Sequence, residues 1–221
     1  MQTKHSRESM AEKIDTVVFD LGGVLIDWNP RYLYRKIFNT EEEVSWFLEN
    51  ICTSEWNDLQ DAGRSFEEAT RELIEKHPQH AVPIGAWYDR WKETIGGSIE
   101  GTVEILRRIR TARKFRLYGL TNWSAETFPW ALANFEFLHW FEGIVVSGIE
   151  KTRKPLPEFF HILFSRYAID PSRALFIDDN VKNIEGAKAL GMNTITFFSP
   201  EQLAEELMTW GVLDEIVSRQ S

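Results

Sequence analysis

The chain has 221 residues, of which 43% are hydrophobic and 27% charged, and this length allows one large domain or a domain that carries a substantial insertion. Its formal net charge of −9 argues against non-specific binding to nucleic acid or anionic membranes, because both require basic surfaces. The single cysteine, Cys52, excludes an internal disulfide and a cysteine-based zinc site, and is typical of a reducing compartment. We therefore expect a cytoplasmic protein without nucleic-acid or membrane partners. Whether it is a monomer or a homodimer stays open.

The first thirteen residues are polar and charged, without the apolar stretch of a signal peptide or a membrane segment, and we expect residues 1–13 to form a disordered tail. The apolar run that follows is rich in β-branched residues and ends at Asp20, before Gly22 and Gly23. This pattern predicts a buried strand of a parallel sheet, with Asp20 at its carboxyl end, where ligands bind in open α/β sheets. The two glycines allow a tight turn and a close approach of the backbone to a ligand.

The chain then has helical patterns over a long stretch. Apolar residues recur three or four positions apart in four segments, at residues 31–38, 41–50, 65–76 and 83–94. Thr40 and Glu43 have the spacing of a capping box at the start of the second segment. No strand is predicted in this block. We therefore expect an all-helical cap domain at residues 30–97, inserted into a core domain formed by residues 14–29 and 98–221.

Strand and helix patterns alternate in the second half of the chain. Further strands are predicted at residues 115–120, 144–146, 174–177 and 193–198. Helices are predicted at residues 102–113, 124–134, 158–167, 183–190 and 200–218. This alternation predicts a mostly parallel sheet with right-handed crossovers. The expected fold class is therefore α/β, a Rossmann-like three-layer core with an inserted helical cap.

Polar side chains stand at the predicted carboxyl ends of several strands or in the loops that follow them. The set comprises Asp20, Thr121, Asn122, Lys154, Asp178 and Asp179. Because ligands in open α/β sheets bind outside the carboxyl ends of the strands, these residues are candidates for one common site. The periodicity of a core does not require polar groups at all these positions.

This set of side chains suits the transfer of a phosphoryl group. A carboxylate that attacks a phosphoryl group meets like-charge repulsion, so the site requires a cation and hydrogen-bond donors. Asp20 and Asp179, with Asp178 behind them, supply the hard oxygen ligands that suit Mg²⁺. Lys154 would neutralise Asp20 and the phosphoryl group, and the Thr121 hydroxyl would bind phosphate. The adjacent acids at 178 and 179 also have a simpler interpretation, as a helix-capping turn.

Four stretches, in this order along the chain, resemble the haloacid dehalogenase-like (HAD) superfamily. They are residues 19–24, 120–122, 154–160 and 177–187, and the resemblance extends over essentially residues 14–198. The helical insertion is similar to the helical cap of that superfamily. Within it, the run Asp-Leu-Gly-Gly-Val from Asp20, together with Glu-Trp-Asn from Glu55, is similar to small cytoplasmic sugar phosphatases, including those that act on α-D-glucose 1-phosphate.

The resemblance implies a role for each residue of the set. Asp20 would be the nucleophile that forms an aspartyl-phosphate, and Lys154 would hold the charge beside it. The implied phosphate-binding residues are Gly23, Thr121, Asn122 and Lys154. The implied Mg²⁺ ligands are Asp20, the backbone carbonyl of Gly22, Asp179 and Asp178. The implied activity is Mg²⁺-dependent hydrolysis of a small phosphorylated metabolite, with a sugar phosphate as the expected substrate.

One position departs from the superfamily. Most of its phosphatases carry a second Asp two residues after the nucleophile, as general acid and base, and this chain has Gly22 there. Losing a positioned acid or base costs roughly 10² to 10⁴ in rate. Either another group transfers the proton, or the leaving group needs little help. Asp27 is one candidate for that group, with the alternative role of capping or orienting the segment that enters the cap.

Two other functions stay open. A 2-haloacid dehalogenase attacks carbon through the same Asp and needs no acid, because halide leaves unaided, which would explain Gly22. The adjacent Asp178 and Asp179 argue against it, since these acids repel Asp20 unless a cation is bound. A non-catalytic binding or regulatory protein of the same fold would not need Asp20, Thr121, Lys154 and Asp179 together. The sequence identifies neither the substrate nor the pathway. In the cap, Trp56, Asn57, Asp58 and Gln60 could face the site, with packing as the expected role of Trp56.

Overall fold

The computed structural model describes residues 14–214, so the predicted tail at residues 1–13 lies outside the described part. Its centre is a five-stranded sheet in the order β5-β4-β1-β6-β7, and all four pairings are parallel. The strands are β1 (Thr16–Phe19), β4 (Arg116–Thr121), β5 (Gly143–Val146), β6 (Ala174–Asp178) and β7 (Asn193–Thr196). The predicted α/β class with a parallel sheet is confirmed.

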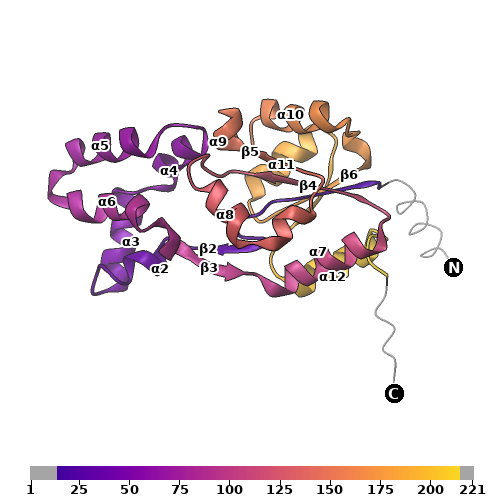
Figure 1. Cartoon of the computed structure of the whole chain (residues 1–221), viewed down its shortest axis with the longest axis horizontal. Coiled ribbons are helices and arrows are strands. Elements are labelled where there is room, and N and C mark those ends of the chain that lie inside the picture. Colours follow the sequence, from indigo (N-terminus) through magenta and orange to yellow (C-terminus); the bar gives the residue numbers. More distant parts are fainter. Residues whose placement is uncertain (1–13, 215–221) are drawn as a thin grey trace, which may run out of the picture.

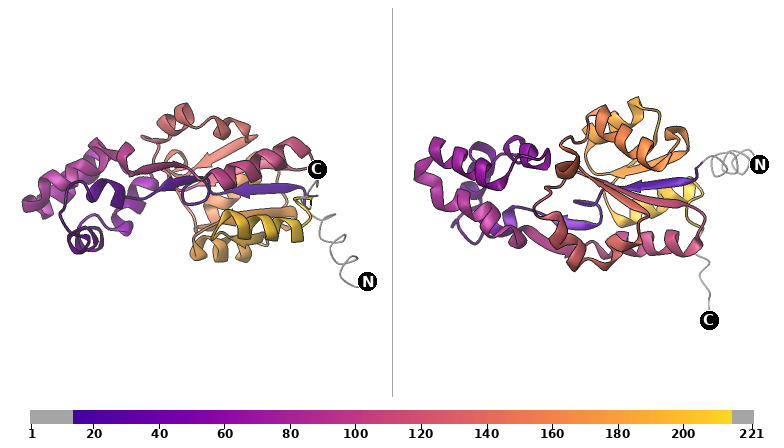
Figure 2. Two further views of the ribbon diagram at one scale, coloured as in Figure 1. Left: turned by 90° about the horizontal axis from the view of Figure 1, so that it is seen from below. Right: turned by 45° about the horizontal axis from the view of Figure 1, so that its top comes forward.

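Helices cover both faces of this sheet, as Figure 2 shows. The residues of β1 are fully buried, and their side chains alternate between two hydrophobic clusters: Val17 and Phe19 belong to one, Val18 to the other. The first cluster includes helices α7 (Glu100–Ala112), α8 (Phe128–Asn134) and α12 (Pro200–Thr209). The second includes α10 (Pro157–Tyr167) and α11 (Val181–Ala189). The core therefore has the three expected layers.

A helical part of the chain lies beyond one end of the sheet (Figure 1), and we call its residues 31–94 the cap. Its elements are α2 (Arg31–Tyr34), α3 (Glu41–Asn50), α4 (Ser54–Asp61), α5 (Phe66–Lys76), α6 (Ala81–Asp89) and the 3₁₀ turns η1 (Pro78–His80) and η2 (Trp91–Thr94). They enclose a hydrophobic cluster of their own, which includes Tyr34, Phe47 and Trp87. The predicted capping box of Thr40 and Glu43 is present.

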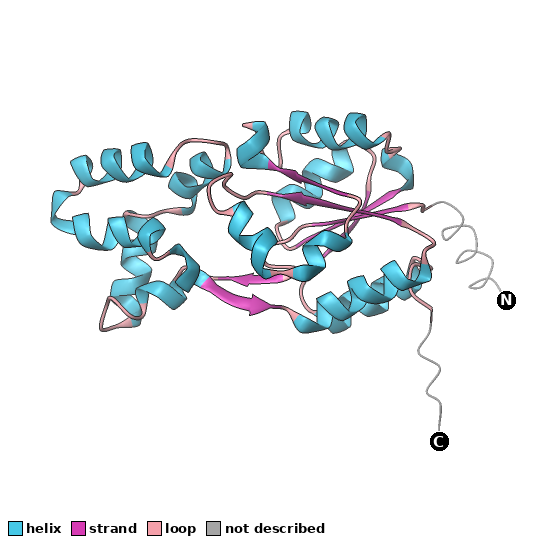
Figure 3. Cartoon of the chain, in the orientation of Figure 1, coloured by secondary structure: helices cyan, strands magenta, loops and turns pink. Residues whose placement is uncertain are grey.

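Two short antiparallel strands join the cap to the core (Figure 3): β2 (Ile26–Trp28) and β3 (Ile95–Ser98). Ile26 pairs with Ser98, so the chain leaves the core and returns to it at adjacent positions. The sequence does not predict β3, because its Ile-Gly-Gly-Ser run has two glycines and no alternation of apolar side chains. The block that was predicted to be all-helical therefore contains most of one strand.

Several other boundaries differ from the prediction by a few residues. The predicted helix at residues 31–38 ends at Tyr34, the helix at 83–94 is divided into α6 and η2, and the strand at 193–198 ends at Thr196. Short elements without a predicted counterpart include η1 in the cap, η3 (Glu136–Trp140), α9 (Ser147–Glu150) and η4 (Pro171–Arg173). None of the helices between residues 14 and 214 combines the length and the apolar character that a membrane span requires.

Candidate active site

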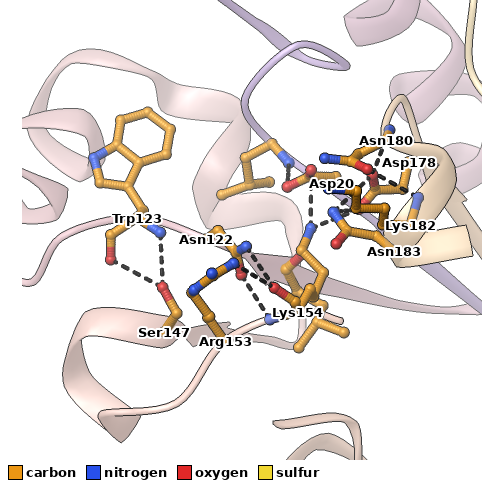
Figure 4. A network of polar contacts seen from close by, with 12 residues as sticks. Asp20, Asn122, Trp123, Ser147, Arg153, Lys154, Asp178, Asn180, Lys182 and Asn183 are labelled. Carbon is orange, nitrogen blue, oxygen red and sulfur yellow. Dashed lines mark hydrogen bonds and ion pairs between the residues drawn. The ribbon is translucent and has the colours of Figure 1, made fainter. Parts of the chain in front are cut away.

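The carboxyl ends of β1, β4 and β6 bring predicted site residues together (Figure 4). The register places Phe19 beside both Gly119 of β4 and Ile177 of β6, so the three strands end at nearly the same level. The next residue, Asp20, donates its backbone N–H to the Ile177 carbonyl at 2.8 Å. The strand pairing itself thus places the Asp20 carboxylate at this edge of the sheet.

Lys154 lies at the centre of the site. Its side chain is fully buried, and Nζ is 2.8 Å from Asp20 Oδ2, 2.7 Å from Asp178 Oδ2 and 2.8 Å from the Leu120 carbonyl oxygen. An ammonium group has three donors, and all three are used here. Burial lowers the pKa of Lys154, but the neighbouring Asp178 and Asp20 carboxylates outweigh it, and the pKa lies above its usual value. Lys154 is therefore a fixed positive charge next to Asp20.

Asn122 holds the backbone of Lys154. Its side-chain Nδ2 donates to the Lys154 carbonyl at 3.0 Å, and its Oδ1 accepts the Lys154 N–H at 2.9 Å. Both ends of the amide are engaged with the loop that carries the lysine. The Asn122 side chain is thus a positioning group in this structure, a role that the sequence did not predict. Phosphate binding by Asn122 stays a prediction.

Asp178 holds the other side of Lys154. It is fully buried, and its Oδ1 accepts from the Asn180 N–H at 2.8 Å, while Asn183 Nδ2 lies 3.1 Å from both of its oxygens. With Lys154 on Oδ2, each carboxylate oxygen has protein partners. Asp178 therefore orients Lys154. Asp178 itself is more deeply buried than its neighbour Asp179.

Three carboxylates crowd this edge of the sheet. Asp20, Asp178 and Asp179 each place an oxygen within 4.8 Å of the others. Burial raises the pKa of Asp20 well above its usual range; Lys154 opposes this shift, and Asp178 and Asp179 reinforce it. Burial and Asp178 also raise the pKa of Asp179. A hard divalent cation would relieve the repulsion, and the donor set fits Mg²⁺, with Asp20 and Asp179 as the carboxylates that face the pocket.

Thr121 ends β4 at the same edge of the sheet. Its hydroxyl is buried and has no hydrogen-bond partner among the described residues. A buried polar group left unsatisfied costs about 1–3 kcal/mol, so such groups usually have a partner. A hydroxyl that donates a hydrogen bond to a ligand oxygen would have no partner before the ligand binds, as is seen here. This observation supports the predicted phosphate contact without testing it.

A pocket of about 570 Å³ separates this edge of the sheet from the cap. The core supplies Asp20, Gly22, Gly23 and Asp179 to its lining. Six aromatic side chains also line it, namely Trp28, Phe66, Trp87, Tyr88, Trp91 and Trp123. The volume is typical of a small-molecule site.

Asp27, a candidate for the missing acid, is not part of this lining. It belongs to β2, and its Oδ2 accepts a hydrogen bond from the Tyr32 hydroxyl at 2.7 Å. Asp27 thus orients the segment that enters the cap, the alternative role considered for it.

The polar face of α4 forms part of the pocket. The sequence suggested Asn57 and Asp58 as residues that face the site, but it did not predict the helix itself, Ser54 or Asp61. Ser54, Asn57, Asp58 and Asp61 all line the pocket, at positions i, i+3, i+4 and i+7 of the helix. Asp58 also forms an ion pair with Arg153 of the core, with 2.9 Å between Oδ2 and Nη2. A search for polar rather than apolar residues at helical spacing would have found this face.

The fold and the site together define a capped α/β protein with a Rossmann-like core and an acidic site at the strand ends. The model of the haloacid dehalogenase-like hydrolase family matches residues 14–191. The chain belongs to this family, as the motifs predicted.

Two curated relatives are similar to this chain. A sesquiterpene phosphatase from Aspergillus oryzae is 24% identical over 183 residues, which are 83% of this chain and 89% of that protein. A drimenol cyclase from Aspergillus calidoustus is 21% identical over 88% of this chain, but the match spans only 36% of that longer protein.

Two solved structures have the same fold. A predicted HAD-like hydrolase from Porphyromonas gingivalis has a TM-score of 0.69 at 23% identity, over 89% of this chain and 97% of that one. A HAD family enzyme from Bacteroides thetaiotaomicron, in complex with magnesium and inorganic phosphate, has a TM-score of 0.65 at 23% identity, over 84% of this chain and 95% of that one.

Proposed function

We propose that the protein is a Mg²⁺-dependent phosphomonoester hydrolase that acts on a small phosphorylated metabolite. The observation that carries this proposal is the arrangement of Asp20: a carboxylate that faces the pocket, 2.8 Å from a fully buried lysine and beside a second pocket-facing acid, Asp179. The similar sesquiterpene phosphatase and the similar fold that binds magnesium and phosphate support the same activity.

The proposed roles follow from the contacts of each group. Asp20 attacks phosphorus and carries the phosphoryl group as an aspartyl-phosphate. Lys154 keeps its charge beside Asp20 throughout, because Asp178 and Leu120 hold its other two donors. Thr121 donates its free hydroxyl to a phosphoryl oxygen. Mg²⁺, held by Asp20, Asp179 and the Gly22 carbonyl with Asp178 behind them, would neutralise the negative charge of the phosphate.

A sugar phosphate is the substrate class that we propose first. The pocket has room for one, and the polar face of α4 would supply hydrogen bonds to sugar hydroxyls. A second candidate is the phosphate ester of an apolar or aromatic group. It is favoured by the six aromatic residues of the pocket and by the similar sesquiterpene phosphatase. The buried thiol of Cys52 fits the cytoplasmic location that we also propose.

A two-part assay tests the activity. Phosphate release from sugar phosphates, isoprenyl phosphates and p-nitrophenyl phosphate is measured with Mg²⁺ and with excess chelator, beside halide release from 2-chloropropionate. We expect phosphate release that the chelator abolishes and Mg²⁺ restores, none from the Asp20→Asn variant, and no halide release. Metal-independent halide release would replace the proposal by a dehalogenase. Full inactivity towards both substrate classes would favour a binding protein.

A further inference from the structure

The proposed reaction requires a group that gives a proton to the leaving oxygen and later takes one from water. Gly22 occupies the position where such a carboxylate is expected, and Asp27 lies outside the pocket. Among the described residues, the other acids that line the pocket besides Asp20 and Asp179 are Glu49, Asp58 and Asp61. The proton donor is to be sought among these three.

Two of the three acids are poor candidates. Glu49 lies exposed on α3, towards solvent, where its charge is screened by water. Burial raises the pKa of Asp58 and Arg153 opposes that increase, but its carboxylate is held in the 2.9 Å ion pair with Arg153, so it is not free to approach a leaving oxygen. Asp61 forms no ion pair within residues 14–214.

We propose that Asp61 is the general acid and base of the hydrolysis, supplied by the cap in place of the carboxylate that is absent at Gly22. This inference rests on the proposed function. Asp61 is the last residue of α4 and belongs to its polar, pocket-lining face. The acid would therefore come from the cap side of the pocket, rather than from the loop that carries the nucleophile.

The contacts of Asp61 hold its carboxylate at the junction of cap and core. Asn57, one turn earlier in α4, donates Nδ2 to Asp61 Oδ2 at 3.2 Å. From the core, the backbone of Ser124 lies close enough to the same carboxylate to lower its pKa. Ser124 follows Asn122 and Trp123 in the loop after β4, and Asn122 is the residue that holds Lys154. Asp61 thus lies next to the loop that also positions Lys154.

The surroundings of Asp61 suit proton transfer near neutral pH. Burial, reinforced by repulsion from Asp58, raises the pKa of Asp61 to about 7, against the opposing effects of Arg153, the Ser124 backbone and Lys154. Tyr88 also faces this region, and burial raises its phenol pKa, so it stays neutral. A group with a pKa near the working pH is populated in both of its forms, which an acid and base in one cycle requires.

The reaction balances with Asp61 as the proton carrier. In the first step the bond between Asp20 and phosphorus forms, the ester P–O bond breaks, and the leaving oxygen takes the electron pair and the Asp61 proton, to depart as an alcohol. In the second step water attacks phosphorus and gives a proton to the Asp61 carboxylate. The bond between phosphorus and Asp20 breaks, its electron pair returns to Asp20, and inorganic phosphate leaves with Asp61 protonated again.

The test compares leaving groups in wild type and in Asp61→Asn. We expect kcat/KM for primary alkyl phosphates to fall by about 10² to 10⁴ in the variant, because an alkoxide leaves poorly without a proton. For p-nitrophenyl phosphate kcat/KM should stay near the wild-type value, since this leaving group needs no proton. Steady-state turnover of p-nitrophenyl phosphate by the variant should be slow after a burst of one equivalent of nitrophenol. The reason is that no base then takes the proton from the water that hydrolyses the aspartyl-phosphate. For alkyl phosphates, kcat/KM of the wild type should fall above pH about 7, and kcat/KM of the variant should not show this fall.

Two further variants sharpen the test. Glu49→Gln removes one negative charge from the pocket wall and should keep the wild-type dependence on the leaving group. Gly22→Asp, combined with Asp61→Asn, returns a carboxylate to the loop after β1, where an added Cβ would meet no atom within 4 Å. This double variant should recover hydrolysis of alkyl phosphates relative to Asp61→Asn alone. A merely structural role of Asp61 would not allow that recovery.

Several outcomes would overturn the inference. Equal losses on alkyl and aryl phosphates in a folded Asp61→Asn variant would show a role in binding or packing only. If kcat/KM of the wild-type protein increases steeply with the acidity of the leaving group, the protein uses no general acid. This result would refute the role of Asp61 even if the Asp61→Asn variant does not fold. A wild type that hydrolyses no phosphate ester in Mg²⁺ would instead refute the proposed function, and the role of Asp61 with it.

Discussion

The carboxylate of Asp179 lies in the space that a β-carbon on Gly23 would fill. An ideal Cβ on Gly23 would lie 2.9 Å from Asp179 Cγ and closer still to Oδ2, and Gly23 has a left-handed φ of 75°. The neighbouring Gly22 has no such restriction, because an added Cβ would have no atom within 4 Å. Of the two glycines after the nucleophile, Gly23 is therefore the one that the acidic cluster requires.

This contrast gives a matched pair of variants. Gly23→Ala should displace the Asp179 side chain, lower the free energy of unfolding by about 1 kcal/mol or more, and weaken the response to Mg²⁺. Gly22→Ala should leave both properties close to wild type. Thermal unfolding and Mg²⁺ titrations of activity measure the two effects. If the two variants have the same stability and the same response to Mg²⁺, the close approach of Asp179 to Gly23 does not matter for function.

The acidic cluster predicts that Mg²⁺ stabilises the protein. A ligand that binds only the folded state adds about 2.7 kcal/mol to the free energy of unfolding at a concentration of 100 Kd. We expect Mg²⁺ to raise the Tm of the wild type and to have little effect on Asp179→Ala, which should also lose activity. Glu185→Ala, on the exposed side of α11, removes a comparable charge and should keep the shift. A Tm that does not respond to Mg²⁺ in the wild type would contradict the site.

The unpartnered hydroxyl of Thr121 predicts that activity and stability change in different directions. Thr121→Val removes a buried group that has no hydrogen bond to any residue in the described range 14–214, so the Tm should stay constant or rise. Phosphatase activity should fall, because the group proposed to bind phosphate is lost. Thr102→Val is the control, since among the described residues Thr102 also has a buried hydroxyl without a partner, but on α7 rather than at the carboxyl end of a sheet strand. Loss of activity in both variants would point to a packing effect.

Asp61 predicts a pH-dependent stability that can be measured without any substrate. Burial raises its folded-state pKa to about 7, above the usual carboxyl value of about 3.9, so the folded state holds this proton more tightly than the unfolded state does. The associated stability is complete below pH about 4 and is lost as the pH rises to about 7. Asp61→Asn, which stays neutral, should therefore match the wild type near pH 4 and exceed it at pH 8.

The expected gain is about 1–2 kcal/mol at pH 8. One pKa unit corresponds to about 1.4 kcal/mol, and the full value is reduced because Asp61 is only partly buried. Denaturant unfolding of both proteins between pH 4 and pH 8 measures the difference. A difference that is constant over this range would mean that Asp61 does not titrate there.

The sequence predicted the core well because two physical rules act together there. A strand that is buried on both faces must be apolar throughout, so the polar residue that ends it is conspicuous. Parallel strands end at one edge of the sheet, so Asp20 and Lys154 could be assigned to one site without knowledge of the strand order. The positioning contacts of Asn122 could not be predicted, because they depend on the path of the loop that carries Lys154.

The prediction failed where a segment serves the pocket rather than a hydrophobic core. The helix α4 has polar residues on the face that lines the pocket, so its apolar periodicity is weak, and the helix was not predicted. Asp61 was overlooked for the same reason. β3 was missed because four residues with two glycines lack the composition of a strand, although pairing with β2 stabilises them.

The pairing of Ile26 with Ser98 predicts that the cap can be exchanged as a unit. The chain crosses between cap and core at two adjacent positions. Another helical segment whose two ends pair as short antiparallel strands should therefore fit at this place without a change in the five-stranded sheet. Asp20, Lys154 and Asp179 would remain with the core, whereas the six aromatic residues would be partly replaced and Asp61 removed. Such a chimera should change the substrate preference and lose the proposed proton donor, while it keeps the proposed nucleophile.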